Sequence, residues 1–206
     1  MLKVIYSSKC ADRGTINYLN AIQQHIMNTK IINTDRYDYE EVTTMLLKNN
    51  EQIIALRPLP ADIEKLITNY LERFKGYDIE GVSNYNSMNY TLTAEAIADE
   101  LKDVEGKRVL IINRSAIVGI PLMQLLVRRG ATVTIAHTKT NNLKELILNT
   151  DILVTATHNP KFKIDNELLT DVEEIIDLSE DTDRADAVRR IKTVHILKER
   201  LHGIDR

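Results

Sequence analysis

The stretch "IINRSAIVGIP", residues 111–121, decides the fold, because it combines a buried apolar strand, a turn and the start of a helix. In α/β proteins this kind of junction is where the phosphates of a dinucleotide usually bind, close to the N–H groups of the helix. The usual Gly-x-Gly-x-x-Gly pattern is incomplete here. Gly119 is its only glycine, while Asn113 and Ser115 stand where small residues are expected. A turn with a solvated basic rim explains these residues as well as a cofactor site does.

Apolar runs alternate with amphipathic stretches on both sides of this junction, which predicts parallel β-α-β units. After residue 104 we expect strands at 107–113, 131–137, 151–157 and 173–179, with helices at 119–129 and 141–149. Before it we expect strands at 2–6, 30–33 and 52–56, and helices at 15–28, 40–48 and 62–74. The pattern therefore predicts an α/β protein of two lobes, the second one Rossmann-like with a mainly parallel sheet.

The turn formers in residues 77–91 predict a boundary between the two lobes. We expect one lobe in residues 1–91, a connecting helix in 92–103, a nucleotide-binding lobe in 104–192 and a tail in 193–206, with a short strand and a helix in that tail. The expected boundary separates two blocks of strand–helix alternation, so each lobe should have its own sheet.

Composition narrows the classes of function. The chain has 206 residues, 43% of them hydrophobic and 28% charged, which is typical of a globular protein. A formal net charge of -3 and few aromatic residues argue against nucleic acid or a membrane as partner. The single Cys10 excludes an intrachain disulfide, and no apolar run approaches the ~18 residues of a membrane span. We expect a cytoplasmic protein.

The residues at the end of the expected strand 131–137 indicate whether the second lobe would prefer NAD or NADP. An NAD-selective site usually places an acidic residue here to bind the ribose hydroxyls. The chain instead has His137-Thr138-Lys139-Thr140, with Arg114 in the preceding turn. Positive charge and hydroxyl groups suit a 2′-phosphate, so any cofactor bound here is predicted to be NADP.

Several of these stretches together resemble the methylenetetrahydrofolate dehydrogenase/cyclohydrolase (FolD) family. "NRSAIVGIP" is similar to its Gly-Arg-Ser-x-x-Val-Gly-x-Pro, and "RRGATVTIAHTKT" and "DILVTAT" follow in the family's order. Upstream, the similarity extends to "TINY" (15–18), "RPLP" (57–60) and "DIEGVSNYN" (78–86). The resemblance covers most of residues 2–180, and several motifs in one order are more specific than any single motif.

The resemblance implies two α/β lobes with a folate cleft between them, NADP on the second lobe and a homodimer. The family oxidises methylenetetrahydrofolate by hydride transfer and then hydrolyses the methenyl product. By position, the resemblance places Tyr18 and Asp78 in the catalytic folate site. It assigns to cofactor binding Thr91, the turn residues Arg114, Ser115 and Gly119, and the loop residues His137, Thr138 and Lys139.

The chain also departs from the family pattern and is similar to a shortened, divergent member. The family's catalytic lysine lies four residues after the tyrosine, and Ile22 occupies that position. An aliphatic side chain cannot move the proton that methenyl hydrolysis requires. We therefore expect cyclohydrolase activity to be lost. Two hypotheses stay open: an NADP-dependent dehydrogenase acting on a folate, and a non-catalytic relative that serves as a binding or interaction module.

Further substitutions remove polar or small groups from the expected site. A family glutamine becomes Leu56, and glycines become Asn113, His158 and Ser179. The family's Pro-Gly-Gly-Val-Gly-Pro-Met-Thr segment is absent after Ser179. The acidic stretch 177–186 predicts a solvated loop rather than a metal site, and we predict no metal ligands in the chain.

Overall fold

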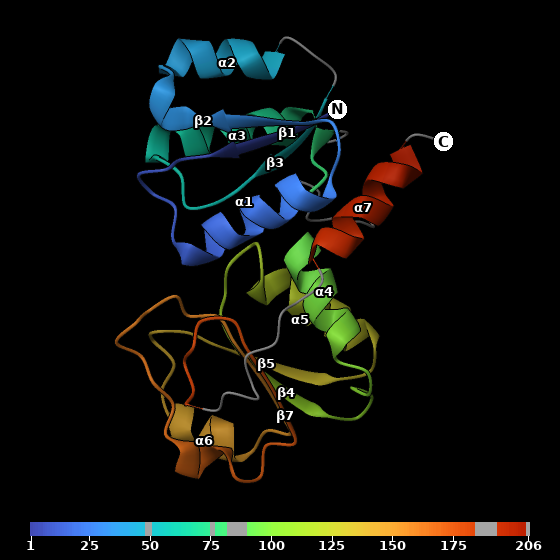
Figure 1. The fold of residues 1–206 in the computed structure, drawn as a ribbon. Coiled ribbons are helices and arrows are strands. Elements are labelled where there is room, and N and C mark those ends of the chain that lie inside the picture. Colours follow the sequence, from blue (N-terminus) through green and yellow to red (C-terminus); the bar gives the residue numbers. More distant parts are fainter. Residues whose placement is uncertain (48–50, 75–76, 82–89, 184–192, 205–206) are drawn as a thin grey trace. The chain divides into compact units, whose positions relative to one another are not determined.

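A computed structural model describes residues 1–47, 51–74, 77–81, 90–183 and 193–204. The chain divides into two compact units, Met1–Tyr90 with Val194–Arg206, and Thr91–Thr193. Each unit has its own sheet, so the prediction of two α/β lobes is confirmed (Figure 1). Parts of the turn-rich segment 77–91 and of the acidic stretch 177–186 lie outside the described residues.

The first unit contains a three-stranded parallel sheet in the order β2-β1-β3. Its strands are β1 (Leu2–Tyr6), β2 (Thr29–Asn33) and β3 (Gln52–Ala55). The central strand β1 is almost wholly buried, as expected of a mainly apolar strand covered on both faces, and it includes the buried Lys3. Residues 77–81 follow helix α3 (Ala61–Arg73), and a parallel bridge joins Asp78 to Ile53 of β3. This segment therefore lies against the edge of β3.

The helices of the first unit cover both faces of its sheet (Figure 1). Helices α2 (Tyr39–Leu47) and α3 (Ala61–Arg73) share one apolar cluster with the strands, and α1 (Arg13–His25) lies on the other face. The N-terminus of α1 is capped by Asp12, whose carboxylate accepts the N–H of Thr15 at 2.7 Å. The short 3₁₀ helix η1 (Thr34–Arg36) follows β2.

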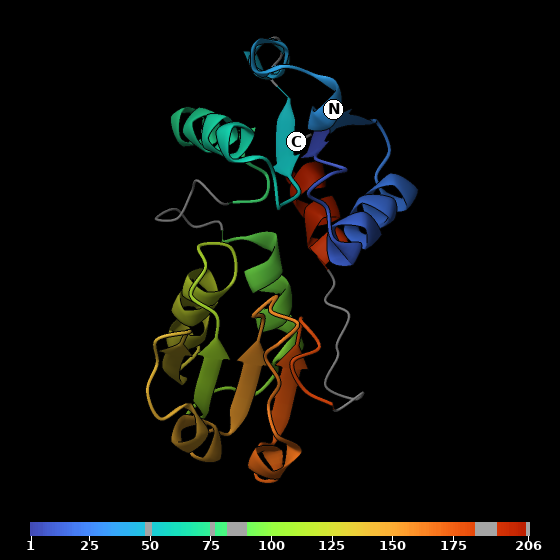
Figure 2. The same ribbon diagram turned by 90° about the vertical axis from the view of Figure 1, so that its left-hand side faces the viewer.

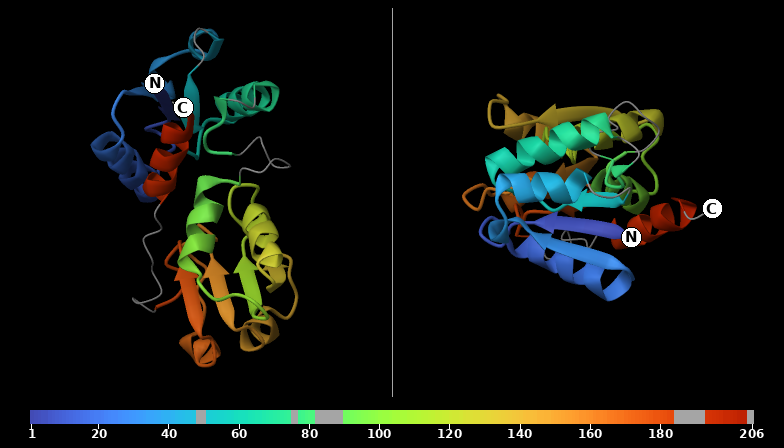
Figure 3. Two further views of the ribbon diagram at one scale, coloured as in Figure 1. Left: turned by 90° about the vertical axis from the view of Figure 1, so that its right-hand side faces the viewer. Right: turned by 90° about the horizontal axis from the view of Figure 1, so that it is seen from above.

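Helix α7 (Thr193–Ile204) is the last described element, yet it groups with the first unit, whose elements lie next to it in Figures 2 and 3. Its Ile196 and Leu197 are buried. The guanidinium of Arg200 donates to the carbonyl of Ile79 at 2.7 Å and also to the carbonyl of Tyr90. Helix α7 therefore holds the segment 77–81, which follows α3. The sequence suggested a strand here, but the structure is helical from Thr193 onward.

The second unit contains a four-stranded parallel sheet in the order β5-β4-β6-β7. The strands are β4 (Arg108–Ile112), β5 (Thr132–Ala136), β6 (Ile152–Thr155) and β7 (Glu174–Asp177). Figure 2 shows their arrows pointing the same way. Every predicted strand of this lobe is present, with one or two residues fewer at the ends.

Helices α4 (Leu92–Glu100) and α5 (Gly119–Arg128) pack on one face of this sheet through a cluster that includes Ile97, Leu122 and Leu126. Helix α6 (Leu143–Leu148) and the 3₁₀ helix η3 (Asn166–Leu169) pack on the other face. Helix α4 was expected to be a connector between lobes. It groups with the second unit, where Ala94, Ala98 and Leu101 belong to the core.

Among the described helices, the structure contains none with the length and apolar character that crossing a bilayer requires.

Candidate cofactor and substrate sites

The carboxyl ends of the four strands of the second unit form one aligned edge. Ile112 at the end of β4 lies beside Ala136 of β5 and Thr155 of β6, and Thr155 lies beside Asp177 of β7. The chain runs outward from β4 to β5 and then returns past β4 to β6, so the strand order reverses between β4 and β6. Ligands of open α/β sheets bind beyond the carboxyl ends at this reversal.

Asn113 spans that reversal point. Its Nδ2 donates to the carbonyl of Ala156 at 2.7 Å, which joins the chain after β4 to the chain after β6. Its Oδ1 accepts the N–H of Ser115 at 2.7 Å and the N–H of Gly119 at 3.0 Å. The residue that replaces the first glycine of the family turn thus makes three hydrogen bonds to the backbone. It holds the turn in one conformation.

Gly119 fits a close approach of the helix to the strand. A Cβ atom here would lie 2.1 Å from the carbonyl oxygen of Asn113, which excludes any larger residue without a backbone shift. This is the role of the third glycine of the dinucleotide fingerprint, where helix and strand pack closely. The sequence assigned Gly119 to the phosphate turn, and the structure places it as the first residue of α5.

Two basic side chains stand exposed near this edge. Arg114 follows Asn113, and Lys139 lies in the loop after β5 beside exposed Thr138. None of these three side chains forms a hydrogen bond or ion pair with the described part of the chain. The loop itself is ordered by His137, whose Nδ1 accepts the N–H of Lys139 at 3.1 Å, and by Thr140, whose hydroxyl accepts the N–H of His137 at 2.8 Å. The arrangement can therefore bind an anion.

The side chain of Thr91 makes its hydrogen bonds within the second unit. It caps α4, accepting the N–H of Ala94 at 3.4 Å, and its hydroxyl donates to the carbonyl of Ile117 at 2.5 Å. The side chain is buried. Thr91 therefore ties the start of α4 to the β4–α5 loop, and that loop carries the residues expected to bind phosphate.

The loops after β6 and β7 contain the positions where the family has glycine. His158 has φ +51°, a left-handed conformation that favours glycine, and its N–H donates to the hydroxyl of Ser179 at 3.1 Å. Histidine is accommodated there with an exposed side chain. The two replacements, His158 and Ser179, thus contact each other across the loops.

The acidic stretch 177–186 begins at the last residue of β7 and is not a solvated loop throughout, so the expectation from the sequence was wrong for two of its residues. Asp177 and Asp181 are fully buried. The Asp181 carboxylate accepts the hydroxyls of Thr155 and Thr157, the latter at 2.6 Å. Asp177 accepts the N–H groups of Ser179, Asp181 and Thr182. Hydrogen bonding satisfies both carboxylates, which explains their burial. Within the described residues no group of His, Cys, Asp and Glu could hold a metal ion.

In the first unit, the residues that the resemblance assigns to folate come from two places. Tyr18 lies on α1, and its hydroxyl is buried. Asp78 is buried beside β3 and accepts the N–H of Gly81 at 3.0 Å. Ile22, at the position of the family lysine, has no exposed surface. This side chain belongs to the packed face of α1.

The loops after β1 and β3 meet at the carboxyl end of the first sheet. The hydroxyl of Thr15, in the first turn of α1, lies 2.8 Å from the carbonyl oxygen of Arg57. Arg57 stands where the family's Leu-Pro-Leu-Pro begins, and its guanidinium contacts Glu64 Oε1 at 2.6 Å and Glu80 Oε2 at 3.2 Å. Sequence reasoning missed this cluster. Its only signal was the arginine itself, a charged residue in an apolar family position.

Glu80 is a buried carboxyl group in this cluster. Burial raises the pKa of Glu80 to about 7, the Arg57 guanidinium opposes that change, and the nearby Asp78 carboxylate adds to it. The carboxyl group can therefore hold or release a proton near neutral pH.

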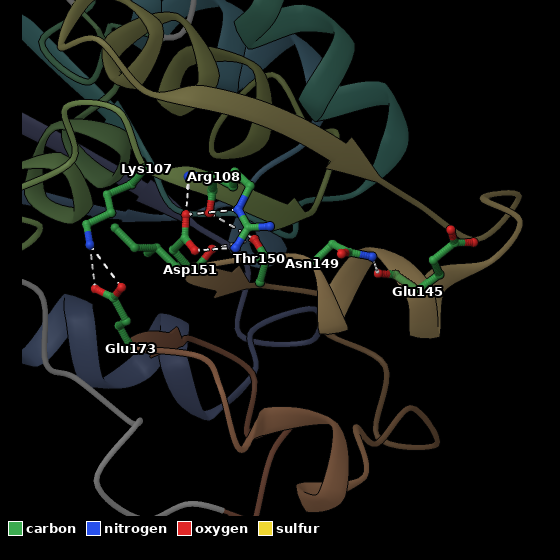
Figure 4. Close-up of polar contacts among 8 residues, drawn as sticks. Lys107, Arg108, Glu145, Asn149, Thr150, Asp151 and Glu173 are labelled. Atoms are coloured by element: carbon green, nitrogen blue, oxygen red, sulfur yellow. Dashed lines mark hydrogen bonds and ion pairs between the residues drawn. The ribbon is translucent and has the colours of Figure 1, made fainter.

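The opposite, amino end of the second sheet carries ion pairs that stabilise the lobe (Figure 4). Arg108 Nη2 lies 2.6 Å from Asp151 Oδ1, and Lys107 Nζ lies 2.7 Å from Glu173 Oε2. Thr150 donates to the carbonyl of Arg108 at 3.0 Å. These contacts join the starts of neighbouring strands, at the edge where α/β sheets do not usually bind ligands.

Comparisons with known proteins agree with this geometry. Residues 92–192 match the model of the tetrahydrofolate dehydrogenase/cyclohydrolase NAD(P)-binding domain. The chain is 38% identical over 170 residues to the bifunctional protein FolD of Petrotoga mobilis, covering 73% of this chain and 61% of that protein. It is 32% identical over 191 residues to that of Clostridium perfringens, covering 81% of this chain and 68% of that protein.

The fold is similar to that of Trypanosoma brucei N5,N10-methylenetetrahydrofolate dehydrogenase-cyclohydrolase (FolD), solved as a complex with NADP cofactor and inhibitor. The TM-score is 0.71 at 19% identity, covering 99% of this chain and 86% of that one. The protein is thus an α/β protein of two units, and its second unit is an NAD(P)-binding domain. It belongs to the FolD family, and it spans about three fifths of the length of the Petrotoga relative.

Proposed function

We propose that the chain is an NADP-dependent oxidoreductase of one-carbon folate metabolism, a methylenetetrahydrofolate dehydrogenase whose cyclohydrolase activity is lost. The observation that carries the proposal is the pair of exposed cations, Arg114 and Lys139, beside Thr138 at the carboxyl edge of β4 and β5. The loop 137–142 contains no acidic residue that would select the ribose hydroxyls of NAD.

The residues fit the cofactor in specific ways. Arg114, Thr138 and Lys139 would hold the 2′-phosphate, with Ser115 and the turn that precedes Gly119 nearby. His137 orders the loop through its bond to the N–H of Lys139. Bound NADP would supply a nicotinamide ring that accepts a hydride. The protein would contribute binding and alignment, which are the main requirements of hydride transfer.

In the first unit, Tyr18 and Asp78 are proposed to contact the folate. Hydrolysis of a methenyl product needs a group that transfers a proton to and from water, and buried Ile22 cannot supply it. The proposal also includes a homodimer, which the family resemblance supports. It includes a cytoplasmic location, which the single cysteine of the chain supports. Equilibrium sedimentation of the purified chain tests the dimer.

The cofactor is tested by titrating NADP and NAD into the purified chain and into Arg114→Ala. We expect NADP to bind the unmodified chain more tightly, and Arg114→Ala to weaken NADP by roughly a hundredfold but NAD much less. The substrate is tested by adding methylenetetrahydrofolate and following NADPH formation. Equal weakening of both cofactors contradicts the assignment of Arg114 to the 2′-phosphate.

A second candidate function is a non-catalytic binding module of the same fold. It is favoured by the buried apolar Ile22 and by His158 in a left-handed glycine position. Binding of NADP without any reduction in the presence of methylenetetrahydrofolate would support this second candidate over the first.

A further inference from the structure

The two backbone N–H groups that frame the β4–α5 turn point at one side-chain atom. The amides of Ser115 and Gly119 both donate to Oδ1 of Asn113, at 2.7 and 3.0 Å. In a glycine-rich turn, N–H groups at the start of the helix are available to a phosphate oxygen. We propose that the Asn113 amide oxygen occupies this anion position, so that these two amides are not available to the pyrophosphate of a bound dinucleotide. This inference rests on the proposed cofactor binding.

Two further donors around the start of α5 support the same inference. The N–H of Val118 donates to the Ser115 hydroxyl oxygen at 3.0 Å, and the N–H of Ile120 donates to the Ser115 carbonyl at 3.1 Å. Both bonds are made within the turn, so these two amides are not oriented toward a ligand. The Ser115 hydroxyl accepts from Val118, and its own proton stays available to a phosphate oxygen.

The Asn113 side chain is held from both ends. Its Nδ2 donates to the Ala156 carbonyl after β6, so rotating the amide away would break three hydrogen bonds at once. Displacement by a phosphate would have to compensate for all three losses. Arg114, by contrast, is exposed and has no partner among the described residues, so its guanidinium can bind without breaking an existing bond. Asn113 is thus a positioning residue that keeps both amides occupied, while Arg114 stays available to the 2′-phosphate.

The first experiment needs no cofactor. Amide hydrogen exchange of the full chain is measured by NMR for the unmodified protein and for Asn113→Gly. We expect exchange at Ser115 and Gly119 to become at least about tenfold faster in the variant, since each amide loses its acceptor. Asn149→Gly is the matched control, because it removes an amide that bonds the Glu145 carbonyl at 2.8 Å at the other end of the same unit (Figure 4). Unchanged exchange at Ser115 and Gly119 in Asn113→Gly would overturn the proposal.

The second experiment is a double-mutant cycle on NADP affinity. It compares NADP and NAD in the unmodified chain, Asn113→Gly, Arg114→Ala and the double variant. Asn113→Gly should tighten both cofactors by roughly tenfold, because the freed amides can bind the pyrophosphate that NADP and NAD share. Arg114→Ala should weaken NADP selectively in either background, since Arg114 is assigned to the 2′-phosphate. Unchanged or weaker binding of both cofactors in Asn113→Gly would overturn the proposal.

The two experiments separate this inference from the proposed function. If neither the unmodified chain nor Asn113→Gly binds NADP or NAD, the proposed cofactor function fails, and the exchange data alone decide whether Asn113 occupies the amides. If only Asn113→Gly binds NADP, occupation of the anion position by Asn113 is supported directly.

Discussion

Nη1 of Arg57 lies 3.2 Å from Oε2 of Glu80, and this ion pair stands at the carboxyl end of the first sheet. Burial raises the pKa of Glu80 to about 7, against an ordinary value of 4.5. The folded state therefore holds this proton more strongly than the unfolded chain does. The resulting contribution to stability is complete below pH 4.5 and is lost as pH rises through 7.

Glu80→Gln cannot titrate, so its free energy of unfolding should change less between pH 4.5 and 7 than that of the unmodified chain. The change is measured by urea unfolding at several pH values. Glu40→Gln, an exposed acid on α2, is the control and should leave the pH dependence as it is. The same pH dependence in Glu80→Gln and in the unmodified chain would contradict the assignment of the raised pKa to Glu80.

Arg57→Ala should destabilise the first unit by about 3 kcal/mol, because it leaves Glu64 and Glu80 without their shared cation. Part of this loss should be recovered as pH falls below 7, where protonation of Glu80 removes the uncompensated charge. Chemical denaturation at pH 4 and pH 8 measures both effects. A loss that is the same at the two pH values would argue against a charged Glu80 as the cause.

Gly119→Ala should destabilise the second unit by about 3 kcal/mol, since a Cβ atom would lie 2.1 Å from a backbone oxygen that cannot move alone. Gly106→Ala is the matched control. Its φ is +72°, but no atom lies within 4 Å of the added Cβ. Strain alone should cost the control about 1 kcal/mol. Equal losses of unfolding free energy in the two variants would show that the close approach at Gly119 does not determine the cost.

Asp151 is expected to contribute to acid sensitivity. Its side-chain and backbone hydrogen bonds to Arg108 lower the pKa of Asp151 to about 2, so its contribution to stability is present above pH 3.8 and is lost as pH falls through 2 (Figure 4). In Asp151→Asn the free energy of unfolding should therefore fall less steeply as the pH drops from 3.8 to 2. The total loss of unfolding free energy should be smaller than in Gly119→Ala. Asp99→Asn, which removes a surface partner of Arg129, is the control. Equal flattening in both variants would contradict the special role of Asp151.

The sequence predicted the framework well because apolar strands and amphipathic helices have distinct periods, and each expected strand of the second unit is present near its expected residues. It predicted less of the site. Asn113 can either disturb a turn that normally contains glycine or stabilise it through hydrogen bonds. Which of the two holds depends on the carbonyl of Ala156, which is 43 residues away. The burial of Asp181 depends likewise on Thr155, which is 26 residues away, and that of Asp177 depends on the conformation of the loop that follows it. The Arg57–Glu80 pair joins residues 23 apart, and no local pattern identifies it.

Ile22 provides the last prediction, which concerns the reaction that the chain is expected not to catalyse. The side chain is fully buried on α1, whereas Ile16 on the same helix is 37% exposed. Ile22→Lys should therefore destabilise the first unit by about 3 kcal/mol, while Ile16→Lys should have little effect on the free energy of unfolding. Methenyltetrahydrofolate should decay no faster with the unmodified chain than in buffer, because Ile22 cannot transfer a proton. The Ile22→Lys variant should show no gain in hydrolysis, since the side chain at this position is fully buried and has no access to water or substrate. A hydrolysis rate that is proportional to the concentration of the unmodified chain, and that persists through further purification, would contradict the loss of cyclohydrolase activity.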